Sequence, residues 1–100
     1  MNNITLTNAA TKTSAFRSTH PNHVKAIIAT QNDLSAILGQ SGCVGVRFYF
    51  ALDDTSDSNS LNLVAVGIDN SGNDMTSGVM KNSGNPCPPY CSQTNSLNSD

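Results

Sequence analysis

The stretch that decides the fold is CVGVRFYFALDD, residues 43–54. Its bulky apolar side chains occupy every second position: Val44, Val46, Phe48, Phe50 and Leu52. Successive side chains of a strand point to opposite faces of a sheet, so this alternation predicts a β-strand with all five on one face. Arg47 and Tyr49 then stand on the other face. We expect the apolar face to pack inward under the helices and the Arg47/Tyr49 face to meet solvent.

Two further strands are predicted after this one, and the three together form an antiparallel meander. The polar loop DDTSDSNS (53–60) leads into LNLVAVGID (61–69), whose apolar residues on both faces favour a central position in the sheet. DNSGND (69–74) is typical of a hairpin turn, with Gly72 supplying a positive φ. MTSGVM (75–80) is predicted to return as a short third strand.

The amino-terminal segment predicts a short helix. Residues 4–18 carry small and aromatic side chains at intervals of three and four, and Thr7 is the expected N-cap. HPNH (20–23) then ends the helix, because Pro21 disfavours the helical conformation of the residue before it.

The next segment, residues 24–40, has two interpretations. Its apolar positions fit one long helix, but the β-branched residues of VKAIIA favour a buried strand at 24–29. A second helix then begins at Asn32, a good capping residue, and ends at Gly39. We prefer this division into a strand and a helix.

These elements predict an α+β fold in which two short helices pack on one face of a mostly antiparallel sheet of about four strands. The helix between the first two strands leaves open a parallel pairing of those strands, and hence a mixed sheet. We expect residues 1–81 to form one α+β domain. Residues 82–100, rich in Pro, Asn and Ser, are expected to be an irregular tail that packs on the domain or is partly mobile.

The charge pattern argues against nucleic acid and membrane partners. Charged residues make up 12% of the chain, all acids are Asp, and the formal net charge is −2. A phosphate-binding surface needs clustered cations, whereas the five here are scattered: Lys12, Arg17, Lys25, Arg47 and Lys81. No apolar run approaches the ~20 residues of a spanning helix. The amino terminus has no signal-peptide pattern and the cysteine count is odd, so we expect a cytoplasmic protein.

The segment NPCPPYCSQ (85–93) carries the most distinctive chemistry, because two cysteines lie four residues apart. Three states of Cys87 and Cys91 are open: a disulfide across a tight turn, a redox-active pair, or two reduced thiols in a Pro-rich loop with Cys43 reduced beside the sheet. A disulfide needs Cα atoms within about 7 Å. The reduced state is the simplest of the three.

A zinc site is a further alternative, because the spacing of the two cysteines falls within the range of zinc-binding knuckles. Cys43 could supply a third ligand and His20 or His23 a fourth. Two consecutive prolines remove backbone N–H donors that such a loop offers to its thiolates, which argues against zinc. We expect no cofactor, with zinc as the alternative.

No phosphate-binding loop, dinucleotide fingerprint or nucleophile elbow occurs, the Asp-rich loops fail the EF-hand template, and few ionisable groups could converge. The sequence therefore favours a small non-enzymatic module that binds a protein partner or associates with itself. The expected docking surface is the Arg47/Tyr49 face, with Tyr90 as a further contact. The alternative is a metal- or thiol-centred protein that uses Cys43, Cys87 and Cys91.

Three stretches taken together resemble a small uncharacterised bacterial protein family: GCVGVRFYFAL, LVAVGIDNSGNDM and NPCPPYCS, which occur in this order over residues 42–92. The segment FRSTHPNHVKAIIA, followed by a short helix, is similar in layout. This resemblance implies the same order of elements and a bacterial origin. The family carries no assigned activity, so the resemblance implies no catalytic residue.

Overall fold

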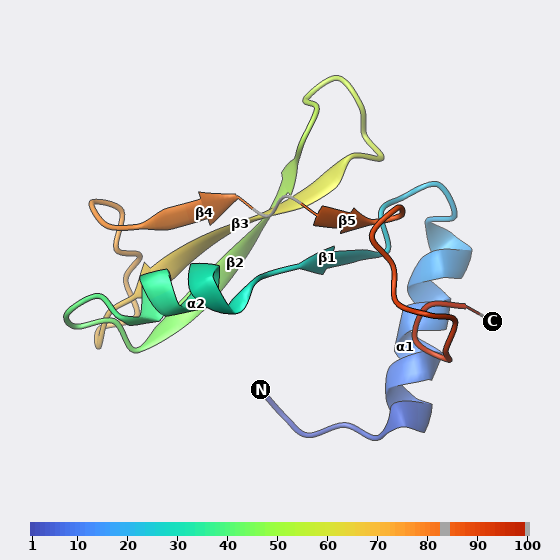
Figure 1. Cartoon of the computed structure of the whole chain (residues 1–100), viewed down its shortest axis with the longest axis horizontal. Helices are drawn as coiled ribbons and strands as arrows, with labels where there is room; N and C mark the ends of the chain where they lie inside the picture. The colour runs from blue at the N-terminus through green and yellow to red at the C-terminus, as the bar shows by residue number, and fades with distance from the viewer. Residues whose placement is uncertain (83–84, 100) are drawn as a thin grey trace.

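The structure is a computed structural model in which residues 1–82 and 85–99 are described. The described residues form two helices and two antiparallel sheets, which confirms the α+β class; their arrangement is shown in Figure 1. The elements follow in the order α1 (Leu6–Thr19), β1 (Ala26–Ile28), α2 (Gln31–Leu38), β2 (Gly45–Leu52), β3 (Leu61–Ile68), β4 (Met80–Asn82) and β5 (Asn85–Cys87). None of the described helices is long and apolar enough to cross a membrane.

The larger sheet has the order β2-β3-β4, and β3 lies at its centre as predicted. β2 pairs with β3 along its full length, from Gly45 opposite Ile68 to Leu52 opposite Leu61. The hairpin turn is also confirmed, with Gly72 at φ +81°. The third strand of the antiparallel meander is confirmed as β4, but it begins only at Met80, the last residue of the predicted segment 75–80. The residues before it form a turn in which Gly78 N–H bonds to Met75 O at 3.0 Å.

The smaller sheet consists of β1 and β5, which pair antiparallel with Ala26 opposite Cys87. The division of residues 24–40 into a strand and a helix is confirmed, but β1 joins β5 instead of the meander and is not buried, since Ile28 is exposed. β5 lies within residues 82–100, so this segment is not irregular throughout. A sequence signal for this pairing is weak, because both strands have only three residues and β5 contains Pro86.

Both helices begin earlier than predicted, and the N-cap of each lies two residues before the predicted N-cap residue. The N-cap of α1 is Thr5 and not Thr7, and its Oγ1 accepts a hydrogen bond from Asn8 N–H at 3.2 Å. The N-cap of α2 is Thr30 and not Asn32, and it accepts from Asp33 N–H in the same way. In each case a Thr in extended conformation precedes the first turn, which satisfies one of its free backbone donors.

The core is small. Ile37 on α2 is 0% exposed, and Ala65 on β3 is buried on the face of the larger sheet that α2 covers. Val66 is buried on the opposite face, where it pairs with Arg47. α1 has no buried residue and stands beside the β1–β5 pair at one end of the molecule (Figure 1). The Ala and Phe stripe of α1 therefore does not cover the larger sheet, and α2 alone packs closely on it.

The chain exposes more surface than its length requires. Its accessible area is 7044 Å², whereas a compact monomer of 10.5 kDa exposes about 5,400 Å². The radius of gyration is 15.1 Å, against about 13 Å for a compact domain of this length. The molecule measures 42 × 36 × 22 Å along its principal axes. Single-layer regions at both ends of this elongated shape leave apolar side chains uncovered.

Candidate functional site

The most distinctive feature of the surface is the exposed apolar face of β2. The inward packing predicted for this face is wrong for most of its residues: Val44, Phe48, Phe50 and Leu52 are exposed, and Phe50 is 83% exposed. The cause is the size of the cover, since the eight residues of α2 span about 12 Å and the eight residues of β2 about 26 Å. α2 therefore leaves the second half of β2 without a layer above it.

Two clefts extend this face on either side of β2. One has a volume of about 340 Å³ and lies between α1 and the sheet, where Phe16, Val24 and Phe50 contribute to its walls. The other, of about 160 Å³, lies beside α2 and includes Phe48. Ile27 and Leu63 line both clefts, so the two are neighbours that share part of their walls.

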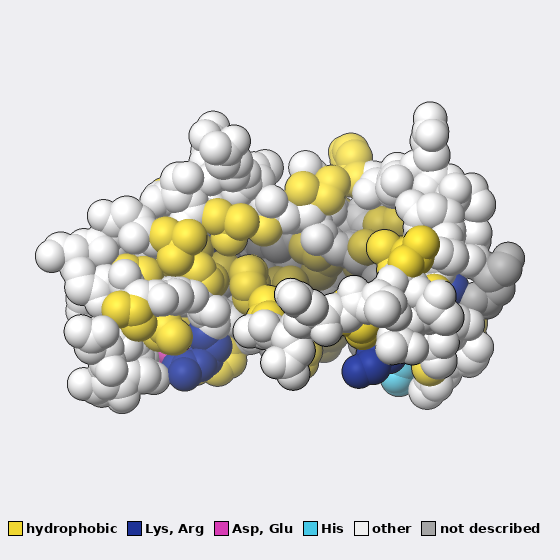
Figure 2. Space-filling view, turned by 90° about the horizontal axis from the view of Figure 1, so that it is seen from below, with side chains coloured by type: hydrophobic (Ala, Val, Ile, Leu, Met, Phe, Trp, Pro, Cys, Tyr) yellow, Lys and Arg dark blue, Asp and Glu magenta, His cyan; other side chains and the backbone are white. Residues whose placement is uncertain are grey.

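We call this region the apolar surface and define it by eight residues: Phe16, Val24, Ile27, Phe48, Phe50, Leu52, Leu61 and Leu63. Figure 2 shows hydrophobic side chains gathered across the middle of this side of the molecule, where the surface is hollowed between its two ends. Large exposed apolar patches are typical of binding surfaces, and this region is therefore the candidate site.

On the opposite face of β2, Arg47 and Tyr49 meet at a carboxylate that the sequence analysis did not identify. Arg47 Nη1 donates to Asp74 Oδ1 at 2.5 Å and Nη2 donates to Gly72 O at 3.1 Å, while the Tyr49 hydroxyl donates to Asp74 Oδ2. The sequence feature that could have pointed to Asp74 is the hairpin turn. The turn returns the chain so that Asp74 forms a β-bridge with Ile68, the last residue of β3, which lies opposite Gly45 of β2. The polar atoms expected to bind a partner thus hold the β3–β4 turn.

The three groups shift one another's protonation. The hydrogen bond from Tyr49 is the main cause that lowers the pKa of Asp74. Desolvation opposes it, and the hydrogen bond and charge of Arg47 lower this pKa further. The bond to Asp74 raises the pKa of Tyr49 above its usual 10.0, and the bond and charge of Asp74 raise the pKa of Arg47. All three shifts favour the state in which Asp74 is ionised and Tyr49 is neutral.

Replacing Asp74 by Asn is expected to remove a pH-dependent part of the stability. The folded-state pKa of Asp74 lies below its ordinary 3.8, so its stabilising effect is complete above that value and is lost as the pH falls through the folded pKa. The melting temperature of D74N should be lower than that of the wild type at neutral pH, and the difference should shrink below about pH 4. Thermal unfolding between pH 7 and pH 2 measures this.

A matched variant tests the cause of the shift. Tyr49→Phe keeps the ring and removes the hydroxyl that contributes most to the lowered pKa of Asp74. In Y49F the carboxyl group of Asp74 should therefore titrate at a higher pH than in the wild type, as followed by NMR. A difference between wild type and D74N that stays constant across the pH range would contradict the network.

The two cysteines of the carboxyl-terminal segment form a disulfide, Cys87–Cys91, with Cα atoms 4.8 Å apart. The disulfide alternative is therefore confirmed and the interpretation with three reduced cysteines is wrong. Cys43 is a free thiol, half-buried at the start of β2, where its Sγ donates to Gly45 O at 3.2 Å. With their sulfur atoms bonded to each other, Cys87 and Cys91 offer no thiolate to a metal.

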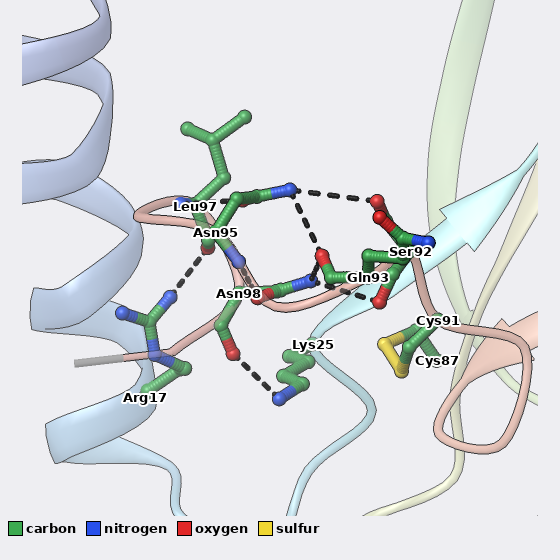
Figure 3. The surroundings of a disulfide bond; sticks show 9 residues. All are labelled: Arg17, Lys25, Cys87, Cys91, Ser92, Gln93, Asn95, Leu97 and Asn98. Carbon is green, nitrogen blue, oxygen red and sulfur yellow. Dashed lines mark hydrogen bonds between the residues drawn. A yellow bond between two sulfur atoms is a disulfide. The ribbon is translucent and has the colours of Figure 1, made fainter.

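The disulfide directs the last residues of the chain across β1 and α1 (Figure 3). Leu97 O accepts from Arg17 Nη1 at 2.5 Å, and Asn98 O accepts from Lys25 Nζ at 2.7 Å. The turn is held from within, because Asn98 Nδ2 donates to Ser92 O and Gln93 O. The tail thus packs beside α1 and not over the Arg47/Tyr49 face.

The remaining predicted ligands do not converge. The rings of His20 and His23 lie 4.7 Å apart and both stack near Phe16, so they form an aromatic cluster at the end of α1. Cys43 belongs to the larger sheet, whereas Cys87 ends β5 in the smaller one. Over residues 1–82 and 85–99, no three His, Cys, Asp or Glu side chains are grouped so that they could hold a metal ion.

Tyr90 lies apart from Arg47 and Tyr49. It sits in the loop closed by the disulfide, where its N–H bonds to Pro86 O at 2.9 Å. Its exposed side chain lines a separate cleft of about 720 Å³ between β1 and the tail, which also includes Ile28. The three residues predicted to form one docking surface therefore belong to two different regions.

No protein-family model, curated protein or solved structure matches this chain. The function is therefore inferred from the contacts and exposures of the described residues.

Proposed function

We propose that this chain is a non-enzymatic protein-interaction module that docks through the apolar surface. The observation that carries this proposal is the position of Phe50, which is 83% exposed at the centre of a contiguous apolar region. Burying an exposed Phe side chain contributes about 1.5–3 kcal/mol. The β2–β3 ladder holds the backbone of Phe50 in place beforehand, so a partner gains this contribution with little loss of backbone freedom.

This proposal moves the docking surface from the Arg47/Tyr49 face to the opposite face of the same strand. Arg47 and Tyr49 direct their polar ends to Asp74, and a partner would have to compete with that carboxylate for them. The side chains of the apolar surface have no such intramolecular partner to displace. An interface core is rich in aromatic side chains, as this surface is, and Lys12, Arg17 and Lys25 lie at its border as the charged rim of an interface does.

The expected cytoplasmic location stays a prediction, and the disulfide argues against it. Disulfides persist in oxidising compartments and are rare where thioredoxin and glutathione keep thiols reduced. Protein taken directly from its native compartment would decide the location. Three thiols that react with an alkylating reagent after denaturation fit the cytoplasm, and one, Cys43, fits an oxidising compartment.

Site-specific photo-crosslinking tests the proposed function. A benzoyl-phenylalanine residue is placed at position 50 within the apolar surface and, as a matched control, at Tyr90, whose ring is also exposed but lies elsewhere. We expect a defined adduct from position 50 only. An adduct counts as a partner when the identified protein, once purified, binds the wild type and fails to bind Phe50→Ser. Equal adduct formation from both positions, or none from position 50, would refute the proposal.

A further inference from the structure

The edge of the larger sheet next to the apolar surface is unpaired. β2 has β3 as its one strand partner within the described ranges 1–82 and 85–99, so its other side is open along eight residues. An open edge is a row of backbone donors and acceptors that can pair with another strand.

The phase of the β2–β3 ladder determines which backbone groups face the open edge. Asp53, the residue after β2, donates its N–H to Ser60 O at 2.8 Å, and these two residues continue the register of the ladder. Hydrogen-bonded pairs alternate along an antiparallel ladder, so the odd-numbered residues of β2 bond to β3. The N–H and C=O groups of the even-numbered residues therefore point to the open edge: Val46, Phe48, Phe50 and Leu52.

This edge lacks the features that keep edge strands from pairing. Native proteins protect their edges with Lys, Pro, short strands or unpaired charges. β2 is eight residues long and contains neither Lys nor Pro. Its one charged side chain, Arg47, is bound to Asp74 of the same chain and is not directed outward as a free charge.

The surplus surface of the chain matches what a homodimer removes. The accessible area of 7044 Å² exceeds that of a compact monomer by about 1,600 Å². When the surplus areas of two chains are added together, the sum lies within the range of obligate homodimer interfaces, which bury about 2,000–5,000 Å² in total. The interface with a second copy of the chain fits within this surplus area.

We propose that two copies of this chain pair through the β2 edge, antiparallel and about a twofold axis, to form one continuous six-stranded sheet. This inference rests on the proposed function, since it places a second copy of the chain along the border of the apolar surface. A twofold axis perpendicular to the sheet keeps corresponding faces on the same side. The apolar surfaces of the two copies therefore join into one.

The backbone phase restricts the register of this pairing. Outward-facing groups belong to even-numbered residues, so only an even residue can bond to an even residue of the second copy. The register with Tyr49 on the twofold axis is the one that engages all four, with Val46 opposite Leu52 and Phe48 opposite Phe50 of the second copy. The four Phe side chains then form adjacent cross-strand aromatic pairs.

The other face of the strand is compatible with the same register. Arg47 comes opposite Ala51 of the second copy, so no two like charges face each other across the new ladder. Tyr49 faces its own copy as a non-hydrogen-bonded pair, in which Cα atoms lie about 4.5 Å apart. That separation is within the range in which a disulfide forms.

Disulfide trapping tests the pairing and its register. Cys43→Ser removes the free thiol, and Tyr49→Cys in that background should then oxidise to a covalent dimer of twice the 10.5 kDa chain. The matched control is Ala51→Cys, on the same strand and face. Its copies lie four residues apart, about 13 Å, which is too far for a disulfide. We expect a covalent dimer from Y49C and none from A51C.

A second measurement uses the unmodified sequence, because Y49C also removes the bond to Asp74. Sedimentation of the wild type at micromolar concentration should give a dimer. Mixed dimers of ¹³C-labelled and unlabelled chains should show an intermolecular contact between the two Tyr49 Hα atoms. A monomer, or a dimer without this contact, would overturn the inference. Either result leaves the proposed function standing if position 50 still crosslinks specifically to another protein.

Discussion

Replacing Ile37 by Ala is expected to lower the free energy of unfolding by about 3 kcal/mol, within the range of about 2–5 kcal/mol for such deletions in protein cores. Ile37 is the largest side chain that is fully buried in the described part of the chain. It lies on α2 against the larger sheet, next to Phe48, Leu63 and Ala65. The truncation leaves a void that the short helix cannot fill by moving, because its first turn is fixed by Thr30. Urea unfolding monitored by circular dichroism measures the change.

The matched control is Leu38→Ala, the next residue on the same helix. Leu38 is exposed, so the same kind of truncation should change the free energy of unfolding by less than about 1 kcal/mol. Effects below about 1 kcal/mol for both substitutions would show that α2 does not anchor the fold. A large effect of L38A alone would place the opposite side of α2 against the sheet.

The alternation in residues 43–54 was sufficient to predict β2 and which of its residues share a face, because the side-chain period of a strand is a local property. It could not predict which face is covered. That depends on the length of α2 and on the position of α1, and α1 lies at the end of the molecule. Phe48 and Phe50 were therefore assigned to the core although both are exposed.

The contacts that join distant parts of the chain were beyond sequence reasoning for a similar reason. β1 and β5 pair across about sixty residues of chain, with three residues each, so neither carries a periodic signal of its own. The candidate site shows the same division. The common face of Arg47 and Tyr49 follows from local spacing, whereas their shared contact with Asp74 depends on where the hairpin turn places that carboxylate.

Removing the disulfide by Cys87→Ala and Cys91→Ala together is expected to lower the free energy of unfolding by about 2 kcal/mol, the chain-entropy estimate for a bridge between residues four apart. The effect should be concentrated at the smaller sheet. Cys87 is buried in β5, and its carbonyl accepts the N–H of Lys25 at 2.8 Å. Without the bridge this amide should exchange with solvent faster, as measured by hydrogen exchange.

The matched control makes the same Cys-to-Ala change at the free cysteine, which removes a thiol and leaves the disulfide intact. Cys43→Ala removes a half-buried side chain that bonds only weakly to Gly45 O, so the exchange of Lys25 N–H should not change. The double variant should also release the tail from α1, because the bridge sets the direction in which residues 92–99 leave β5. The bonds from Arg17 and Lys25 to tail carbonyls should then weaken together. Unchanged exchange at Lys25 in the double variant would show that the β1–β5 pairing holds the tail without the disulfide.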